Sequence, residues 1–151
     1  MSSLHSRDRA SAYATTVGAW ADSLLLAARL FLAAVFLYSG AVKLLAWQAA
    51  VTEFGQLDVP LPVIAVTATV VVQLLGGLAI GLGWRVRAAA AALAAFTVIA
   101  TLIGHPFWAL AGVEFQRQLT TALEHLAIVG GFLLLTVTGP GRLSLEGKGR
   151  E

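Results

Sequence analysis

Hydrophobic positions along the chain fall into four long blocks, separated by short connections richer in polar residues. Each block has about 20 residues, the length that spans a hydrocarbon core roughly 30 Å thick at about 1.5 Å per helical residue. The pattern predicts an all-α fold, an integral membrane four-helix bundle. Its expected spans are about residues 23–43, 61–83, 86–104 and 119–138.

The connections carry a second, weaker pattern. Residues 46–57 mix aromatic and small apolar positions without forming a run long enough to span, and residues 107–118 are similar. Both are typical of short interfacial helices. The polar ends, residues 1–22 and 142–151, are expected to be tails outside the membrane, with Asp22 or Ser23 as the N-cap of the first span. We therefore predict a single membrane domain over residues 1–151.

Composition agrees with a membrane protein and excludes several classes of function. Hydrophobic residues make up 58% of the chain and charged residues 12%, far from the usage of soluble domains. The absence of cysteine excludes disulfides, thiol redox chemistry and cysteine-ligated metals. The basic residues are scattered and form no stripe, so a nucleic-acid partner is not expected.

The distribution of basic residues predicts the orientation in a bacterial cytoplasmic membrane. By the positive-inside rule, connections rich in Lys and Arg lie in the cytoplasm. The first tail, the connection after the second block and the last tail carry most of them: Arg7, Arg9, Arg85, Arg87, Arg142, Lys148 and Arg150. Only Lys43 and Arg117 stand opposite. Both termini are therefore predicted to be cytoplasmic.

Several ionisable residues must lie within the membrane. The charge-free part of the fourth block, residues 126–141, has 16 residues and is too short to cross alone. Counting back from Thr138 puts Glu124 and His125 roughly 8 Å below the outer surface. The same count draws Arg29 into the first span. Charged side chains at such depth usually face the bundle interior or a wet cavity.

Helical spacing then assigns faces. Arg29, Phe36 and Lys43 share a stripe that is expected to face inward. On the fourth span Glu124 shares a face with Leu135 and His125 is turned about 100° away, so one of the two is expected to point inward and the other toward a neighbouring helix or the interface. Depth suggests a pairing of Arg29 with Gln73. The candidate internal polar site comprises Arg29, Lys43, Gln73, His105, Glu124 and His125. The candidate helix-packing positions are Gly40, Gly77, Gly81 and Gly131, at spacings that allow close approach of backbones.

Five stretches in order resemble the DoxX family, across about residues 24–146: "RLFLAAVFLYSGAVKLL", "FGQLDVPLP", "QLLGGLAIGLGWRVRAAA", "TLIGHPFW" and "LAIVGGFLLLTVTGPGRLSLE". The resemblance implies a four-helix bundle in the bacterial cytoplasmic membrane. It also implies kinship with small subunits that look like parts of a thiosulfate:quinone oxidoreductase, although fold supports function only weakly.

The chain departs from the family pattern at two places. Relatives usually have Lys-Asn where Glu124 and His125 stand, and commonly a Glu at the position of Gln73. A carboxylate has thus moved from the second span to the fourth, where it is expected to neutralise Arg29 or Lys43. The departure puts in doubt any family role that needs a lysine in the fourth span.

Each polar residue has a structural and a functional interpretation. Arg29 is either held by helix-end carbonyls and Gln73 or contacts a quinone carbonyl or lipid phosphate, and Lys43 is interpreted as an interfacial anchor. Glu124 is either half of a helix-locking ion pair or a proton-handling group. His105 is expected to cap the third span, and two histidines without a third ligand do not make a metal site, so none is predicted.

Three hypotheses for the function follow. The first is a non-catalytic or weakly catalytic accessory subunit of a quinone-linked oxidoreductase system, with no intrinsic cofactor, a quinone as candidate ligand and a redox enzyme as partner. The second is a carrier of a small solute or proton, which would require a homo-oligomer because four helices are few for a transporter. The third is a structural scaffold in the lipid bilayer.

Overall fold

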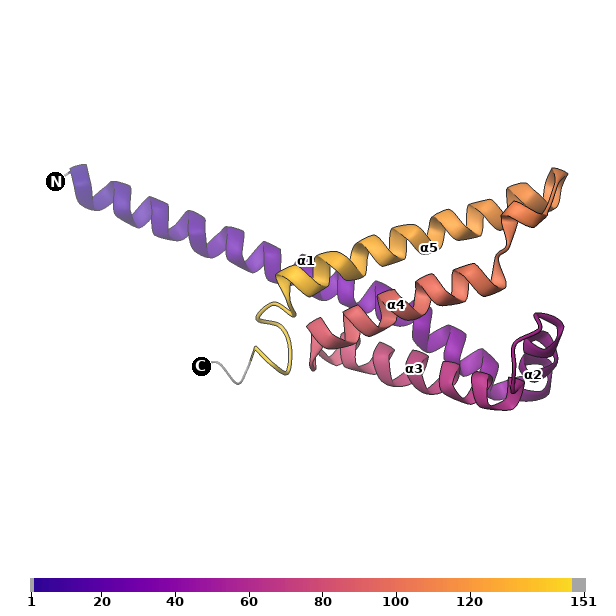
Figure 1. The fold of residues 1–151 in the computed structure, drawn as a ribbon. Coiled ribbons are helices and arrows are strands. Elements are labelled where there is room, and N and C mark those ends of the chain that lie inside the picture. Colours follow the sequence, from indigo (N-terminus) through magenta and orange to yellow (C-terminus); the bar gives the residue numbers. More distant parts are fainter. Residues whose placement is uncertain (1, 148–151) are drawn as a thin grey trace.

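The computed structural model describes residues 2–147, with side chains described from residue 18 onward except at residue 19. This part of the chain is helical throughout, apart from its connections (Figure 1). The elements are α1 Ser2–Leu45, α2 Trp47–Gln56, α3 Pro62–Leu82, α4 Val86–Gly104, a short 3-10 helix η1 Phe107–Ala109 and α5 Gly112–Thr138.

Four helical segments of this part of the chain are long and apolar enough to cross a membrane. They are Trp20–Leu45, Pro62–Leu82, Val86–Ala109 and Gly112–Thr138. The prediction of an all-α membrane bundle with four spans is therefore confirmed. The short helix expected in residues 46–57 is also present, as α2.

Two predicted boundaries are wrong. Helix α1 begins at Ser2 and runs through residue 22 without a break, so neither Asp22 nor Ser23 caps it; the Asp22 carboxylate instead accepts a hydrogen bond from the backbone N–H of Arg142 (2.8 Å). No proline interrupts this segment, so nothing stops the helix where the apolar run ends.

The second boundary error concerns the 107–118 connection. Only Phe107–Ala109 forms a separate short helix, and α5 begins at Gly112 instead of near residue 119. Glu114 lies in the first turn, where a carboxylate interacts favourably with the helix dipole, and it pairs with Arg117 at 2.7 Å. The fourth helix thus continues beyond its apolar run, with a charge pair in its first turns.

The spans are arranged as two pairs. Helix α1 packs along α3 and α4 along α5, whereas α1 and α5 touch little. In Figure 1 the pairs converge near the α3–α4 turn and diverge toward α2 and η1. We call the first end, formed by residues 83–85 and 139–147, the tail end, and the other, formed by residues 46–61 and 104–111, the loop end.

The apolar core explains this wedge shape. One cluster joins both pairs in the middle and toward the tail end, with Phe36 packed against Phe132 (ring centroids 5.3 Å apart) and around the buried Ile80 and Leu93. A second, smaller cluster around Val66 lies at the loop end and joins α2 only to its own side of the bundle. The core therefore leaves the two pairs apart at the loop end.

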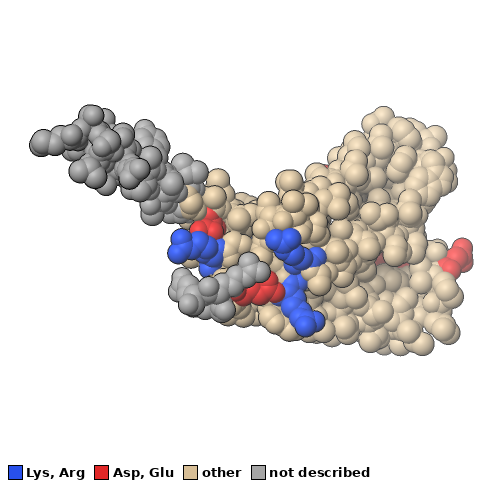
Figure 2. Space-filling view, turned by 60° about the vertical axis from the view of Figure 1, so that its left-hand side comes forward, with Lys and Arg blue, Asp and Glu red and all other residues tan. Residues whose placement is uncertain are grey.

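Charged side chains are distributed unevenly between the tail end and the loop end. On the face shown in Figure 2, Lys, Arg, Asp and Glu side chains gather around the tail end, and a long uncharged surface separates them from an acidic side chain at the loop end. Such an uncharged belt is what a hydrocarbon core requires.

The candidate packing glycines all lie against a neighbouring helix. A Cβ at Gly40 would come within 2.9 Å of Leu74, one at Gly77 within 3.0 Å of Leu37, and one at Gly131 within 3.3 Å of Leu32. At Gly81 the nearest atom, the Ala33 Cβ, is at 3.5 Å, an ordinary contact. Close approach of α1 and α3 thus depends on Gly40 and Gly77 more than on Gly81.

The same substitution at two glycines of α3 should have opposite effects. Gly76→Ala would place a Cβ 2.8 Å from the fully buried Leu93, so we expect a loss of about 1–3 kcal/mol from overpacking. Gly81→Ala meets only an ordinary contact and should gain up to about 1 kcal/mol from helix propensity. Unfolding in mixed micelles measures both. Equal effects of the two changes would contradict the α3–α4 packing.

The C-terminal segment folds back onto the tail end. The backbone N–H groups of Leu145 and Glu146 donate to the carbonyls of Leu82 and Gly83 (3.2 Å each), and Ser144 is buried. Residues 142–147 of the expected polar tail therefore pack on the bundle, while residues 148–151 lie outside the described part of the chain.

Candidate functional site

Arg29 holds the C-terminal segment to the tail end. Its side chain is 1% exposed, and its guanidinium donates to the carbonyls of Pro140, Leu143 (2.8 Å) and Gly81 (3.4 Å). The predicted carbonyl partners are thus present. The predicted pairing of Arg29 with Gln73 is wrong, because Gln73 lies farther along α3 toward the loop end and bonds to Ser39. These contacts give Arg29 a structural role.

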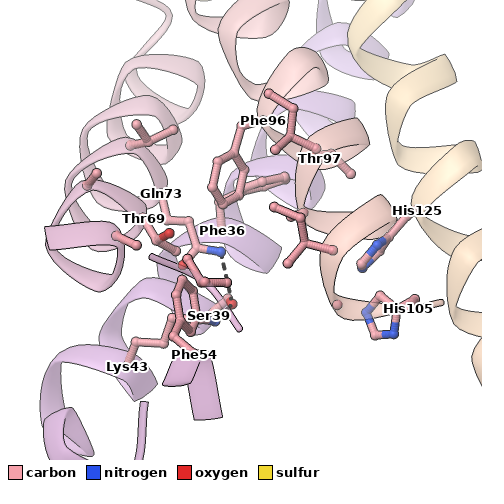
Figure 3. A pocket seen from close by; sticks show the side chains of 18 of the residues that line it. Phe36, Ser39, Lys43, Phe54, Thr69, Gln73, Phe96, Thr97, His105 and His125 are labelled. Atoms are coloured by element: carbon pink, nitrogen blue, oxygen red, sulfur yellow. Dashed lines mark hydrogen bonds between the residues drawn. The ribbon is translucent and has the colours of Figure 1, made fainter. Parts of the chain in front are cut away.

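A cavity of about 480 Å³ opens between the two helix pairs toward the loop end (Figure 3). Most of its lining is apolar and comes from α1, α3 and α4, with Phe54 added by α2 and Ile128 by α5. Two groups of polar side chains stand on opposite walls. Those groups include four members of the predicted site: Lys43, Gln73, His105 and His125.

On the α1–α3 wall, the side chains of Lys43 and Gln73 both bond to the hydroxyl of Ser39. Lys43 Nζ donates to Ser39 Oγ at 2.9 Å, and Gln73 Nε2 donates to the same oxygen at 3.1 Å. Gln73 is only 6% exposed, and its buried Oε1 has no hydrogen-bond partner within the described residues. Glu53 from α2 also lines the cavity and attracts the charge of Lys43. Glu53, and not Glu124, is therefore the carboxylate that attracts the Lys43 ammonium group.

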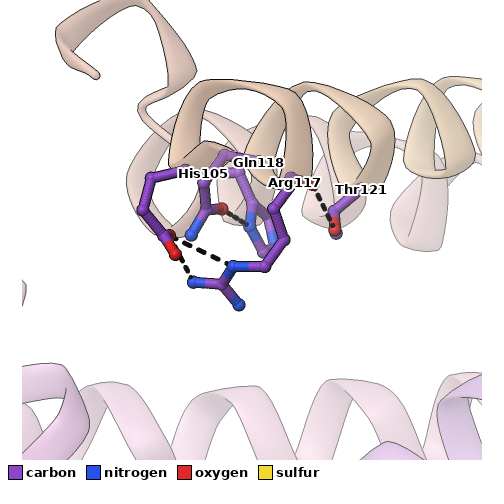
Figure 4. Close-up of polar contacts among 5 residues, drawn as sticks. His105, Arg117, Gln118 and Thr121 are labelled. Carbon is purple, nitrogen blue, oxygen red and sulfur yellow. Dashed lines mark hydrogen bonds and ion pairs between the residues drawn. The ribbon is translucent and has the colours of Figure 1, made fainter. Parts of the chain in front are cut away.

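On the α4–α5 wall, two imidazoles meet edge to face. The rings of His105 and His125 lie 5.0 Å apart between centroids, at 71°. His105 Nδ1 lies 2.5 Å from Gln118 Oε1 (Figure 4). His125 Nδ1 lies 2.8 Å from Thr101 Oγ1. His105 is also the C-cap residue of α4. Both rings are thus fixed by neighbours that do not belong to the cavity lining.

Glu124 does not belong to this cavity. It is exposed on α5, whereas His125 is half-buried and continues the inner face through Ile128 and the buried Phe132. Of the two adjacent residues, His125 is thus the one that points inward, and the expectations that Glu124 belongs to the internal site and neutralises Arg29 or Lys43 are wrong. Arg117, at the start of α5, pairs with Glu114 on the exposed side of the helix (Figure 4).

Sequence reasoning missed Ser39, Thr101 and Gln118. A signal for two of them was present, because residues four apart share a helix face. Ser39 precedes Lys43 by four positions, and Thr97, Thr101 and His105 repeat the same spacing along α4. The third, Gln118, could not be found this way, because it lay in a segment predicted to precede the fourth span.

The cavity can bind a compact, largely apolar molecule with polar atoms at opposite ends. It lies in the size range of about 300–1,000 Å³ typical of ligand sites, which combine apolar walls with a few placed polar groups. Among the residues whose side chains the structure describes (18 and 20–147), no group of three or more His, Cys, Asp or Glu could hold a metal ion.

Fold and cavity together define a small multi-span integral membrane protein with a ligand-sized site between two helix pairs. Comparison with known families makes this assignment more specific: the profile of the DoxX family matches residues 24–106, more than half of the chain. The chain belongs to the DoxX family.

Two relatives from Escherichia coli K12 are similar over most of their length. Inner membrane protein YphA is 31% identical over 129 residues, which cover 85% of this chain and 92% of YphA. Inner membrane protein YqjF is 30% identical over 130 residues, covering 83% of this chain and 91% of YqjF. No solved structure matches the chain.

Proposed function

We propose that the chain is an accessory membrane subunit of a quinone-linked oxidoreductase system, which holds a quinone-type ring in the cavity and presents it to a redox partner. The observation that carries the proposal is the placement of polar groups on opposite walls of an apolar cavity: Gln73 with Lys43 on one side, His105 with His125 on the other. A quinone-type ring carries its two oxygens at opposite ends, so each would meet one wall.

Access from the bilayer supports a lipid-soluble ligand. Val35, Ile99 and Ile103 line the cavity and are each about half exposed. Side chains that belong both to a cavity and to the lipid-facing surface mark its opening. A ligand dissolved in the membrane could therefore enter sideways, between the two helix pairs, without crossing the interface.

We infer the need for a partner from the side chains that the sequence lacks and from one exposed charge within a span. Without cysteine there is no thiol couple and no ligand for an iron–sulfur cluster. Glu124 lies within a span and is exposed, and an ionised side chain near the bilayer centre costs about 2.5–3.5 kcal/mol. We propose that the partner subunit, or a second copy, covers this face of α5.

The orientation remains the one that the basic residues predict. Arg85, Arg87 and Arg142 lie together at the tail end, which we propose faces the cytoplasm with both termini. The cavity would then lie in the half of the membrane away from the cytoplasm. Activity of a C-terminal reporter that works only outside the cytoplasm would contradict this.

Extraction from native lipid tests the proposal. The protein would be isolated together with the native lipids that surround it. The ratio of quinone to phospholipid in these particles, measured by mass spectrometry of the extracted lipids, should be about tenfold or more higher than the same ratio in the bulk membrane. A four-span protein of another family, isolated in the same way, is the control. A ratio equal to that of the bulk membrane would contradict ligand holding.

Identification of the proteins that co-purify in the same lipid particles tests whether a redox partner binds. We expect a redox enzyme subunit to co-purify with the wild-type chain and to be lost with Glu124→Gln, which removes the charge and keeps the shape. Retention of the partner by this variant would show that Glu124 is not part of the contact.

A further inference from the structure

The hydrogen-bond network around the imidazole pair fixes which nitrogen of each ring carries a proton. Thr101 has one hydroxyl proton, and it is donated to the carbonyl of Thr97 at 2.6 Å. Thr101 Oγ1 must therefore accept at its 2.8 Å contact, so His125 Nδ1 carries the proton. His105 Nδ1 likewise donates to Gln118 Oε1, because an amide oxygen only accepts. In the neutral rings both Nε2 atoms are acceptors, and no hydrogen bond joins either of them to another described residue.

The opposite wall offers an acceptor as well. Ser39 already receives hydrogen bonds from Lys43 and Gln73, and the remaining Gln73 oxygen is buried without a donor among the described residues. Buried acceptors are normally paired, and leaving one unpaired weakens any complex that fails to supply a donor. Acceptors thus belong to both walls, the two Nε2 atoms to one and the buried Gln73 Oε1 to the other.

We infer that the cavity selects the reduced, dihydroxy form of an aromatic ring over the quinone form, with one hydroxyl donating to the Nε2 of the His105–His125 pair and the opposite hydroxyl donating to Gln73 Oε1. This inference rests on the proposed function and specifies its ligand. A hydroquinone supplies both donors, whereas a quinone supplies none. Lys43 is compatible with either form, because hydroxyl and carbonyl oxygens both accept.

Binding of three matched rings tests the selection. We would use menadiol, menadione and the dimethyl ether of menadiol, under anaerobic conditions, on the full chain in lipid nanodiscs. Menadiol is expected to bind about tenfold or more tightly than the other two, because only it donates. Binding of menadione as tight as that of menadiol overturns the inference and leaves the proposed function standing. No binding of any ring overturns both.

Variants separate selection from folding. Gln73→Leu removes the buried acceptor, and Thr101→Val removes the group that fixes His125, which makes Thr101 a positioning residue. Each variant removes one of the two acceptor contacts, so each should lower the menadiol-to-menadione affinity ratio about threefold or more while menadione affinity stays unchanged. A purely structural role would weaken both rings alike and leave the ratio intact. Thr67→Val, on the exposed side of α3 and outside the cavity lining, should change neither value.

Discussion

Replacing Arg29 with methionine is expected to release the C-terminal segment and to destabilise the protein by about 3 kcal/mol or more. The substitution keeps an apolar stem but leaves three carbonyls, at Pro140, Leu143 and Gly81, without their charged donor. Each buried acceptor left unpaired costs about 1–3 kcal/mol. Unfolding in mixed micelles measures the stability, and trypsin cleavage after Arg142 reports release of the segment.

Two controls accompany this variant. Arg29→Lys keeps the charge but cannot reach three carbonyls with one compact ammonium group, so it should fall between wild type and Arg29→Met. Arg85→Met removes an exposed arginine at the same end and should have little effect. If Arg29→Met unfolds and is cleaved like the wild type, the carbonyl contacts do not hold the segment.

Ala100→Phe is expected to abolish ligand retention while the protein stays folded. Ala100 lines the cavity from α4 and is half-buried, so a phenyl ring there would occupy the space assigned to the ligand. We expect the retained quinone to fall about tenfold or more, because overlapping ring volumes cannot coexist in a close-packed site. Stability should change by less than about 1.5 kcal/mol, since the new ring fills an existing cavity.

The matched control is Ala91→Phe. Ala91 lies on the same helix, is exposed and is outside the cavity lining. Quinone retention should match that of the wild type. Equal loss in both variants would mean that retention depends on α4 in general and not on the cavity.

The sequence predicts the architecture because span length and hydropathy are determined by the bilayer. The four spans and α2 agree with the structure to within a few residues wherever an apolar run ends at a proline or glycine. The starts of α1 and α5 could not be predicted from hydropathy, because helices continue beyond their apolar runs when no residue breaks them. Glu114 and Arg117 form an ion pair within a helical segment that composition assigns to a connection.

The candidate site was harder to predict, for a geometric reason. Glu124 and His125 are adjacent and both polar, so the pattern cannot decide which of two directions about 100° apart faces inward. Burial of Phe132 in the core, on the same helix face as His125, decides it in favour of His125. The predicted pairing of Arg29 with Gln73 is wrong because the two side chains lie at different depths in the membrane. Arg29 reaches the carbonyl of Gly81, which lies eight positions (81 − 73) and roughly 12 Å beyond Gln73 along the helix.

Photolabelling with an azido-quinone in native membranes tests the ligand site most directly. We expect adducts on cavity-lining residues such as Ile99 and Ile103, which excess quinone suppresses and Ala100→Phe prevents. Val98 and Leu102, which are exposed on the same helix outside the lining, should remain unlabelled. Labelling of Val98 and Leu102 to the same extent as Ile99 and Ile103, unaffected by Ala100→Phe, would contradict the claim that the cavity holds a quinone-type ring.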